Sequence, residues 1–417
     1  MRYGLIGEKL GHSFSKVIHE RLCAYEYDLL PLPREEVGPF LTRREFAGIN
    51  VTIPYKETVL PYLTYIDPVA RSIGAVNTIV NRDGLLFGYN TDAAGLADLL
   101  RANGFAVAGK KILVLGSGGT SKTACAVAQS LGARQVLVVS RRPSGPGQIS
   151  YEQAAAGHAD AEGLFNTTPV GMFPKLEGAP VDLAPFSRLT FVVDAIYNPL
   201  RTRLLQQAQD LGIPCANGLR MLVAQAKAAA EHFLGAPLPD AGTDRVYGEL
   251  AREMRSLALI GMPSCGKTTL GRLLAAHMGR ELVDLDEKIA RDAGLSIPEI
   301  FAREGETGFR ARETAALREV AGRQGLVVAT GGGIVKNPEN VRLLRANAAV
   351  CFVQRGLARL SSADPSRPLS TSAEALARMY AERLPLYTAA ADFSVSNEGA
   401  AEETARAIED QFKEMCR

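Results

Sequence analysis

The stretch LALIGMPSCGKTTLGRLL, residues 257–274, decides the fold of the second half of the chain. A short apolar run, Leu257–Ile260, leads into the glycine-rich turn GMPSCGKT (261–268), and an amphipathic run follows. This is the order of a strand, a phosphate-binding loop and a helix. The backbone N–H groups of such a loop and the N-terminus of the following helix bind two phosphates. The alternative interpretation is an ordinary glycine-containing turn between a strand and a helix.

The phosphate-binding loop predicts specific contacts to a nucleotide. The Lys267 ammonium is expected to reach the outer phosphates, and the Thr268 hydroxyl is expected to bind Mg²⁺. The residues predicted to bind ATP here are Ser264, Cys265, Gly266, Lys267, Thr268 and Thr269. Because such loops usually follow the first strand of their domain, a new domain is expected to begin near residue 255.

The length and composition indicate a globular protein of two to three domains. The chain has 417 residues, 47% of them hydrophobic, and a net charge of +2, which gives no electrostatic case for nucleic-acid or membrane partners. No apolar run reaches the roughly 18 residues of a membrane span, and the N-terminus does not resemble a signal peptide. The six cysteines form no metal-spaced pair. We therefore expect a reduced, cytoplasmic protein, with the oligomeric state, including a homodimer, left open.

Four short motifs follow one another in the first hundred residues. They are HSFS (12–15), NVTIPYK (50–56), GAVNT (74–78) and YNTD (89–92). Taken singly, a serine near a helix start is a cap and a lone lysine or aspartate is a solvated charge. Taken together, in this order and spacing, the motifs resemble the N-terminal domain of shikimate dehydrogenase.

This resemblance implies a substrate site and a catalytic pair. It assigns contacts with the carboxylate and hydroxyls of the substrate to Ser13, Ser15, Thr52, Asn77, Asp92, Tyr197 and Gln225. It assigns the chemistry to Lys56 and Asp92, because a lysine beside a carboxylate can protonate a ketone oxygen as hydride reaches the carbon. The sequence departs from the family at Lys16, where Pro is usual, and at Ala93, where Gly is usual.

A dinucleotide-binding pattern follows the first lobe. The apolar strand Lys111–Leu115 runs into GSGGTSK (116–122), and a second strand, Gln135–Val139, ends in Ser-Arg-Arg. An acid at that end would indicate NAD, whereas basic residues suit the 2′-phosphate of NADP. The alternative is a solvated basic turn, and the turn-rich PSGPG that follows indicates a shortened connection. The residues predicted to bind NADP are Gly116, Ser117, Gly118, Gly119, Thr120, Ser140, Arg141, Arg142 and Gly218.

The motifs beyond the phosphate loop resemble shikimate kinase over residues 256–417. They are ELVDLD (281–286), IFAREGETGFRARE (300–313), VVATGGGIV (327–335), SRPLS (366–370) and ERLPLYTAAADF (382–393). The resemblance implies that Asp284 joins Thr268 around Mg²⁺, that Asp286 is the catalytic base or orienting residue, and that Arg367 lies on a lid over the ATP phosphates. The residues that it assigns to shikimate are Asp286, Arg310, Gly331, Gly332, Gly333 and Arg383. Helix caps for the acids and a flexible turn for the glycines are the alternatives.

The sequence therefore predicts an α/β fusion of two enzymes. A dehydrogenase would comprise a substrate lobe (1–102) and a Rossmann NADP lobe (103–250) whose last helices return to the first lobe. A P-loop kinase with a parallel sheet would follow (256–417). We expect NADPH-dependent reduction of 3-dehydroshikimate and then ATP- and Mg²⁺-dependent phosphorylation of shikimate, on the route to chorismate and the aromatic amino acids. The alternatives are a quinate- or NAD-preferring first half, or a non-catalytic module attached to an active kinase.

Overall fold

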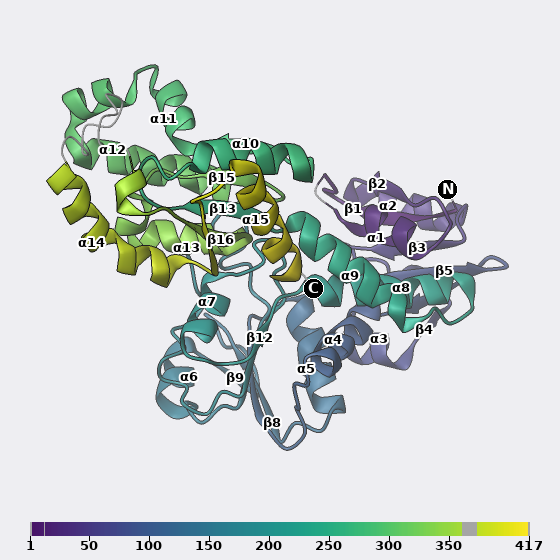
Figure 1. The fold of residues 1–417 in the computed structure, drawn as a ribbon. Helices are drawn as coiled ribbons and strands as arrows, with labels where there is room; N and C mark the ends of the chain where they lie inside the picture. Colours follow the sequence, from purple (N-terminus) through teal and green to yellow (C-terminus); the bar gives the residue numbers. More distant parts are fainter. Residues whose placement is uncertain (1, 12, 361–372, 416–417) are drawn as a thin grey trace. The chain divides into compact units, whose positions relative to one another are not determined.

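The computed structural model describes residues 2–11, 13–360 and 373–415, and the chain forms two compact units (Figure 1). The first unit contains Met1–Met172, Glu177–Tyr197 and Leu204–Tyr247. The second unit contains Phe173–Leu176, Asn198–Arg203 and Gly248–Arg417. The described residues form three sheets, two in the first unit and one in the second.

The first sheet is mixed, with strand order β2-β1-β3-β5-β6-β4. Its strands and the helices between them are β1 (Tyr3–Gly7), α1 (Ser15–Leu22), β2 (Asp28–Pro31), α2 (Arg34–Arg43), β3 (Gly48–Val51), β4 (Tyr65–Ile66), α3 (Pro68–Ile73), β5 (Thr78–Arg82), β6 (Leu85–Tyr89) and α4 (Thr91–Ala102). Strand β5 begins at Thr78, the last residue of the GAVNT motif. Since β5 runs antiparallel to β3, its first residues lie beside the last residues of β3, with Thr78 opposite Asn50.

The second sheet is parallel throughout, in the order β12-β11-β10-β7-β8-β9 that is typical of dinucleotide-binding folds. Its elements are β7 (Lys111–Leu115), α5 (Gly119–Ser130), β8 (Gln135–Val139), β9 (Gln148–Ile149), α6 (Tyr151–Gly157), β10 (Gly163–Asn166), β11 (Phe191–Asp194), α7 (Arg203–Asp210) and β12 (Cys215–Ala216). The connection after Arg142 keeps a seven-residue helix, α6, which a capping box between Ser150 and Gln153 begins.

Two long helices, α8 (Leu219–Leu234) and α9 (Asp240–Met254), complete this region. Helix α8 crosses α4 closely, since a Cβ added at Gly95 would lie 2.5 Å from the Met221 carbonyl oxygen. Further along α8, Ala229 and Phe233 belong to the same buried cluster as Tyr3 of β1. Helix α8 therefore packs on the first sheet as well as beside the second, and α9 leads directly to the first strand of the second unit.

The second unit has a five-stranded parallel sheet in the order β14-β15-β13-β16-β17. Its elements are β13 (Ser256–Ile260), α10 (Lys267–Met278), β14 (Leu282–Asp284), α11 (Leu285–Ala293), α12 (Ile297–Ala321), β15 (Val327–Ala329), α13 (Pro338–Asn347), β16 (Ala348–Gln354), α14 (Ala373–Ala390), β17 (Phe393–Ser396) and α15 (Ala401–Met415). Strand β13 is central and buried along its whole length, which explains its uninterrupted apolar sequence. Helix α10 begins at the phosphate loop and ends at Gly279, which adopts a left-handed conformation.

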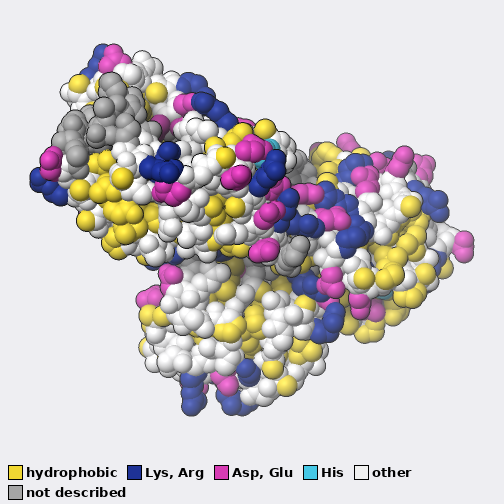
Figure 2. All heavy atoms as spheres, viewed as in Figure 1, with side chains coloured by type: hydrophobic (Ala, Val, Ile, Leu, Met, Phe, Trp, Pro, Cys, Tyr) yellow, Lys and Arg dark blue, Asp and Glu magenta, His cyan; other side chains and the backbone are white. Residues whose placement is uncertain are grey.

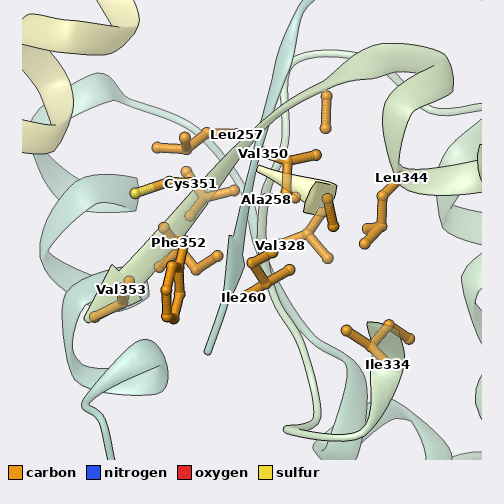
Figure 3. Packing of buried hydrophobic residues seen from close by; sticks show 14 of the residues in the cluster. Leu257, Ala258, Ile260, Val328, Ile334, Leu344, Val350, Cys351, Phe352 and Val353 are labelled. Carbon is orange, nitrogen blue, oxygen red and sulfur yellow. The ribbon is translucent and has the colours of Figure 1, made fainter. Parts of the chain in front are cut away.

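The core of the second unit surrounds the neighbouring strands β13 and β16 (Figure 3). Figure 3 shows the side chains of Leu257 and Ile260 in β13 packed among those of β16 and its neighbours. The cluster extends to Val328 of β15 and to Leu344 of α13. Burial of these side chains fixes the carboxyl end of β13, which carries the phosphate loop.

A short segment from the middle of the chain, Asn198–Arg203, belongs to the second unit. The backbone N–H of Leu200 donates to Asn347 Oδ1 at 2.9 Å. The Arg201 guanidinium donates through Nε to the Arg345 carbonyl at 2.6 Å and forms an ion pair with Asp392 at 3.2 Å. These bonds attach the segment to the junction between α13 and β16 and to Asp392, just before β17. The second unit therefore includes residues well outside 256–417.

We expect Arg201→Ala to loosen this part of the second unit. The substitution removes half-buried charge-assisted bonds, which contribute about 1–3 kcal/mol when they are partly shielded from water. Amide hydrogen exchange at residues 346–350 should accelerate, while exchange in β7 and β10 of the first unit should not change. The matched control is Arg188→Ala, at an exposed arginine. Unchanged exchange at 346–350 in Arg201→Ala would show that the segment contributes nothing to this unit.

The visible face of each unit mixes acidic and basic side chains, with apolar side chains scattered between them (Figure 2). This pattern agrees with the small net charge. Among the helices of the described residues, none combines the length and the hydrophobicity that a bilayer-crossing segment needs.

Candidate active sites

The first candidate site is a salt bridge between Lys56 and Asp92 in the first unit. Lys56 lies in the turn after β3, and Asp92 lies in the first turn of α4, whose N-cap is Asn90. The Lys56 ammonium and the Asp92 carboxylate are 2.5 Å apart, and both side chains are largely but not fully buried. A lysine and a carboxylate in this arrangement can hold and exchange a proton beside a bound ligand.

Amide side chains surround the Lys56–Asp92 pair. Asn77 Nδ2 donates to the other oxygen of Asp92 at 2.9 Å. The same amide lies 3.5 Å from Gln225 Oε1, on helix α8. The structure thus brings together Lys56, Asn77, Asp92 and Gln225, which are separated by up to 169 residues in the sequence. All four were predicted to act at one site.

The two predicted serines and Tyr197 lie around the start of α1. The backbone N–H of Ser15 donates to Ser13 Oγ at 3.2 Å, so Ser13 also supports the beginning of the helix. The ring of Phe14, between the serines, meets the Tyr197 ring edge-on at a centroid distance of 5.9 Å. Burial raises the pKa of Tyr197. Thr52 lies next to β1, where its methyl group would be 2.5 Å from a Cβ added at Gly7.

The predicted NADP residues lie at the carboxyl ends of β7 and β8, except Gly218, which follows β12. Gly118 is the N-cap of α5, and a Cβ added at Gly118 or Gly119 would meet no atom within 4 Å. Gly116 has a different reason to be glycine: its φ is +104°, and an added Cβ would lie 2.9 Å from Thr167 Oγ1. A Cβ at Gly218 would lie 2.1 Å from the Ala195 carbonyl oxygen, so Gly218 permits a close backbone contact.

The residues present fit a dinucleotide that carries a 2′-phosphate. Open backbone at the N-terminus of a twelve-residue helix suits a pyrophosphate. Ser140 follows β8 directly, its hydroxyl accepts from the Arg142 backbone N–H at 3.2 Å, and the side chains of Arg141 and Arg142 are exposed. Arginine side chains at this strand end suit a phosphate rather than a ribose hydroxyl. Ser117 and Thr120 belong to the same loop and helix start.

The second candidate site is a cavity of about 520 Å³ in the second unit. It is lined by both polar loops and apolar side chains from α12 and α14. Twelve of the residues predicted from the sequence line it: Ser264, Gly266, Lys267, Thr268, Thr269, Asp284, Asp286, Arg310, Gly331, Gly332, Gly333 and Arg383. The predicted lid residue Arg367 lies outside the described residues.

The phosphate loop is held by its own lysine and by Asn397, the residue after β17. The Lys267 ammonium donates to the carbonyl oxygens of Gly261 and Met262 at 2.9 and 2.8 Å, which keeps it within the loop. Cys265 is buried, and its carbonyl oxygen accepts from Asn397 Nδ2 at 2.8 Å. Gly266 has φ +100°, and an added Cβ would lie 2.6 Å from the same Asn397 amide. The loop therefore owes its shape to neighbours that the sequence motif does not include.

The two carboxylate oxygens of Asp284 have different partners in the structure. Its Oδ1 caps helix α11 by accepting from the backbone N–H groups of Asp286 and Glu287. Its Oδ2 accepts from the Thr268 hydroxyl at 2.7 Å. Oxygen donors of this kind suit Mg²⁺, which keeps several waters and needs few protein ligands. Among the described residues, no group of three or more His, Cys, Asp or Glu is placed to hold a metal ion.

The three glycines 331–333 each face a different partner. A Cβ at Gly331 would lie 2.9 Å from both Asp286 Oδ1 and Glu313 Oε1. A Cβ at Gly332 would lie 2.8 Å from Pro263 Cδ in the phosphate loop, and one at Gly333 would lie 2.1 Å from Arg310 NH2. The run of glycines is therefore a close junction of the acids, the phosphate loop and an arginine, and not simply a flexible turn.

The structure adds Glu313 and Tyr387 to the predicted residues of this site. Glu313 is fully buried, pairs with Arg310 at 2.9 Å, and burial raises its pKa while the arginine opposes the shift. Its Oε1 has no hydrogen-bond partner among the described residues. Arg383 NH1 donates to the Gly332 carbonyl oxygen at 2.9 Å, and the Tyr387 hydroxyl donates to the same oxygen. Glu313 lies three residues after Arg310 in α12, and Tyr387 lies four residues after Arg383 in α14. A search one helical turn from each predicted arginine would therefore have found both.

Comparisons with known proteins match one family to the N-terminal part of the chain and another to the C-terminal part. Residues 5–79 match the model of the shikimate dehydrogenase substrate binding domain, and residues 263–413 match that of shikimate kinase. The shikimate dehydrogenase (NADP(+)) of Clostridium beijerinckii is 35% identical over 269 residues, covering 61% of this chain and 99% of that protein. The chain belongs to the shikimate dehydrogenase family. Its C-terminal part carries, in addition, a shikimate kinase domain.

Solved structures extend the likeness to the fold of the dehydrogenase part. A chorismate mutase/shikimate 5-dehydrogenase fusion protein from Clostridium acetobutylicum aligns with a TM-score of 0.57 at 35% identity, covering 60% of this chain and 96% of that chain. The shikimate 5-dehydrogenase of Thermus thermophilus, solved in complex with NADP(H) and shikimate, aligns with a TM-score of 0.55 at 31% identity, covering 60% of this chain and 99% of that one. Together with the kinase domain, these matches support a bifunctional oxidoreductase and kinase.

The dense packing around Gly333 leads to a prediction for the kinase domain. In Gly333→Ala the new methyl group should displace the Arg310 guanidinium, which is the flexible end of a long side chain. The fold should therefore survive, while KM for shikimate should rise about tenfold, the cost of about 1.4 kcal/mol of lost charge-assisted binding. Steady-state kinetics with shikimate and ATP varied separately would test this.

The matched control for Gly333→Ala is Gly248→Ala. A Cβ added at Gly248, in helix α9, would meet no atom within 4 Å, so this variant should behave as the parent protein. An unchanged KM for shikimate in Gly333→Ala would mean that Arg310 does not bind the substrate.

Proposed function

We propose that the chain carries out two consecutive reactions, the NADPH-dependent reduction of 3-dehydroshikimate and the ATP-dependent phosphorylation of the shikimate formed. The first proposal rests on the 2.5 Å Lys56–Asp92 pair beside Asn77 and Gln225. The second rests on the cavity that joins the phosphate loop to Asp286 and two arginines. We assign the reactions to residues 1–102 with 103–250, and to 256–417, respectively.

In the reductase reaction the chain's own residues would bind the substrate and move a proton. NADPH, when bound, supplies hydride to the carbonyl carbon. Ser13, Ser15, Thr52, Asn77, Tyr197 and Gln225 would hold the carboxylate and hydroxyls. The Lys56 ammonium would donate its proton to the carbonyl oxygen as negative charge develops there, so that the C=O bond becomes C–OH. Asp92 would orient Lys56 and accept a hydrogen bond from the substrate.

In the kinase reaction the protein would mainly neutralise charge and position the two substrates. Mg²⁺, when bound to Thr268 and Asp284, supplies positive charge beside the phosphates. Lys267 and the loop amides would bind the outer phosphates of ATP. Asp286 would orient the shikimate 3-hydroxyl and take its proton as the new O–P bond forms and the bond to ADP breaks. Arg310 and Arg383 would bind the shikimate carboxylate and nearby oxygens, a task that suits their planar donor groups.

One experiment tests both halves of the proposal. The purified full-length protein is supplied with shikimate and NADP⁺, and NADPH formation is followed with and without ATP and Mg²⁺. We expect oxidation of shikimate without ATP, and diversion of shikimate to a phosphate ester when ATP and Mg²⁺ are added. Parallel reactions with quinate, and with NAD⁺, give the substrate and cofactor preference. Faster turnover with quinate or NAD⁺ would overturn the assignment of the first half.

A further inference from the structure

Three buried polar side chains in the first unit have no role in the proposed contacts. Tyr27 and Thr78 have no exposed surface, and Asn50 is 5% exposed. The Tyr27 hydroxyl donates to Asn50 Oδ1 at 2.6 Å. This bond leaves the Asn50 NH₂ group pointing the other way, where it donates to Thr78 Oγ1 at 3.0 Å and to the Asn77 carbonyl oxygen at 3.2 Å. The three side chains form a directed chain of hydrogen bonds from Tyr27, just before β2, across β3 to β5.

This chain of hydrogen bonds continues into the Lys56–Asp92 pair. Because Thr78 Oγ1 accepts from Asn50, its own proton is available to Asn77 Oδ1, which lies 3.1 Å away. The backbone N–H of Thr91 donates to the same oxygen at 2.7 Å. With Oδ1 occupied by these donors, the Asn77 amide must direct Nδ2 toward Asp92, to which it donates at 2.9 Å. A flipped amide would instead place its oxygen against the carboxylate.

The far end of this network is held by stacked rings. The His19 ring lies parallel to the Tyr27 ring, with centroids 4.1 Å apart and planes at 7°. Burial lowers the pKa of His19 to about 3, so this ring is neutral at physiological pH. The Tyr25 hydroxyl lies 2.7 Å from His19 Nδ1. Tyr27 therefore has one position for its hydroxyl, and burial keeps it protonated by raising its pKa well above the usual value.

We propose that Tyr27, Asn50 and Thr78 are positioning residues of the reductase, which set the orientation of the Asn77 amide and, through it, of Asp92 and Lys56. The inference rests on the proposed reductase function of this site. None of the three residues needs to touch the substrate. Their effect would come from a fixed hydrogen-bond direction, which matters most when a proton must leave Lys56 in one geometry.

The test uses full-length variants that remove one hydroxyl each. Thr78→Val and Tyr27→Phe should lower kcat for shikimate oxidation about three- to tenfold, the value of one hydrogen bond. KM for NADP⁺ should not change, and the solvent deuterium isotope effect on kcat should grow, because proton movement becomes slower relative to other steps. Thr78→Ser restores the hydroxyl and should recover the parent kcat.

The control variant is Tyr55→Phe, which removes another fully buried tyrosine hydroxyl of the first unit, one that donates to the Leu32 carbonyl oxygen at 2.6 Å and not to Asn50. It should retain the parent kcat. If Thr78→Val equals the parent, if Thr78→Ser fails to rescue, or if Tyr55→Phe causes the same loss, the network does not position the pair. Kinase turnover of each variant reports on the rest of the chain and should stay constant.

A second measurement is independent of turnover. The side-chain amide resonances of Asn77, followed by NMR in the full chain, should shift in Tyr27→Phe and stay in place in Tyr55→Phe. An unmoved resonance in Tyr27→Phe refutes the network even if the parent protein proves inactive with shikimate. An inactive parent with a shifted resonance refutes the proposed reductase function and supports the network.

Discussion

Lys56→Ala should lower the rate of hydride transfer by about 10²-fold or more while the rate of phosphoryl transfer stays near that of the parent. The substitution removes the proton donor, and a positioned acid contributes about 10²–10⁴-fold to such a reaction. It also leaves the Asp92 carboxylate without the partner that lies 2.5 Å away in the structure. Reduction of 3-dehydroshikimate and phosphorylation of shikimate, measured on the same preparation, give the two rates.

The fused chain supplies its own control for this experiment. Because both proposed activities belong to one polypeptide, normal phosphorylation shows that the second unit is intact and that the protein is correctly quantified. A matched lysine in the first unit is Lys227, which is similarly shielded and bonds to Glu231 and Asp240 at 3.0 and 2.9 Å. Lys227→Ala should keep both activities. If Lys56→Ala still reduces the ketone at the parent rate, another group supplies the proton.

Local patterns in this sequence predicted the elements that carry the sites. Strand β13 and helix α10 lie where the apolar run and the glycine-rich turn indicated, because buried parallel strands and phosphate loops have strong local signatures. The sequence analysis did not predict the short helix α6, because the turn-forming PSGPG segment indicated a shortened connection. The capping box that begins α6 lies only a few residues after that segment. The pairing of β5 with β3 has no such local signature, because antiparallel pairing depends on partners distant in sequence.

Contacts between residues that are distant in sequence could not be predicted from local patterns. Asn50 of β3 lies opposite Thr78 of the neighbouring strand β5. The contact between them depends on the pairing register of the two strands, which no local pattern encodes. The bond from Asn397 to the phosphate loop joins residues 132 positions apart. Asp284 was interpreted as either a cap or a ligand, whereas its two oxygens allow both. Sequence patterns thus indicated which residues carry the chemistry, and the fold determines which neighbours orient them.

Asp286→Asn should produce the opposite result to Lys56→Ala, with phosphorylation reduced by about 10²-fold or more and reduction unchanged. The amide has the size of the carboxylate but cannot accept the proton of the shikimate hydroxyl, so the loss should appear in kcat. KM for ATP should stay constant, because the phosphate loop and the Thr268–Asp284 pair are untouched.

Asp292→Asn on the same helix is the matched control for Asp286→Asn, because Asp292 bonds to Lys288 at 2.6 Å and does not line the cavity. It should keep both activities. The contrast between the two asparagine variants separates a chemical role from a general loss of negative charge on α11. Parent-like phosphorylation by Asp286→Asn would mean that the hydroxyl loses its proton without help from this carboxylate. The catalytic part of the second site would then consist of the cationic and backbone groups that hold the phosphates, with Asp286 as a binding residue at most.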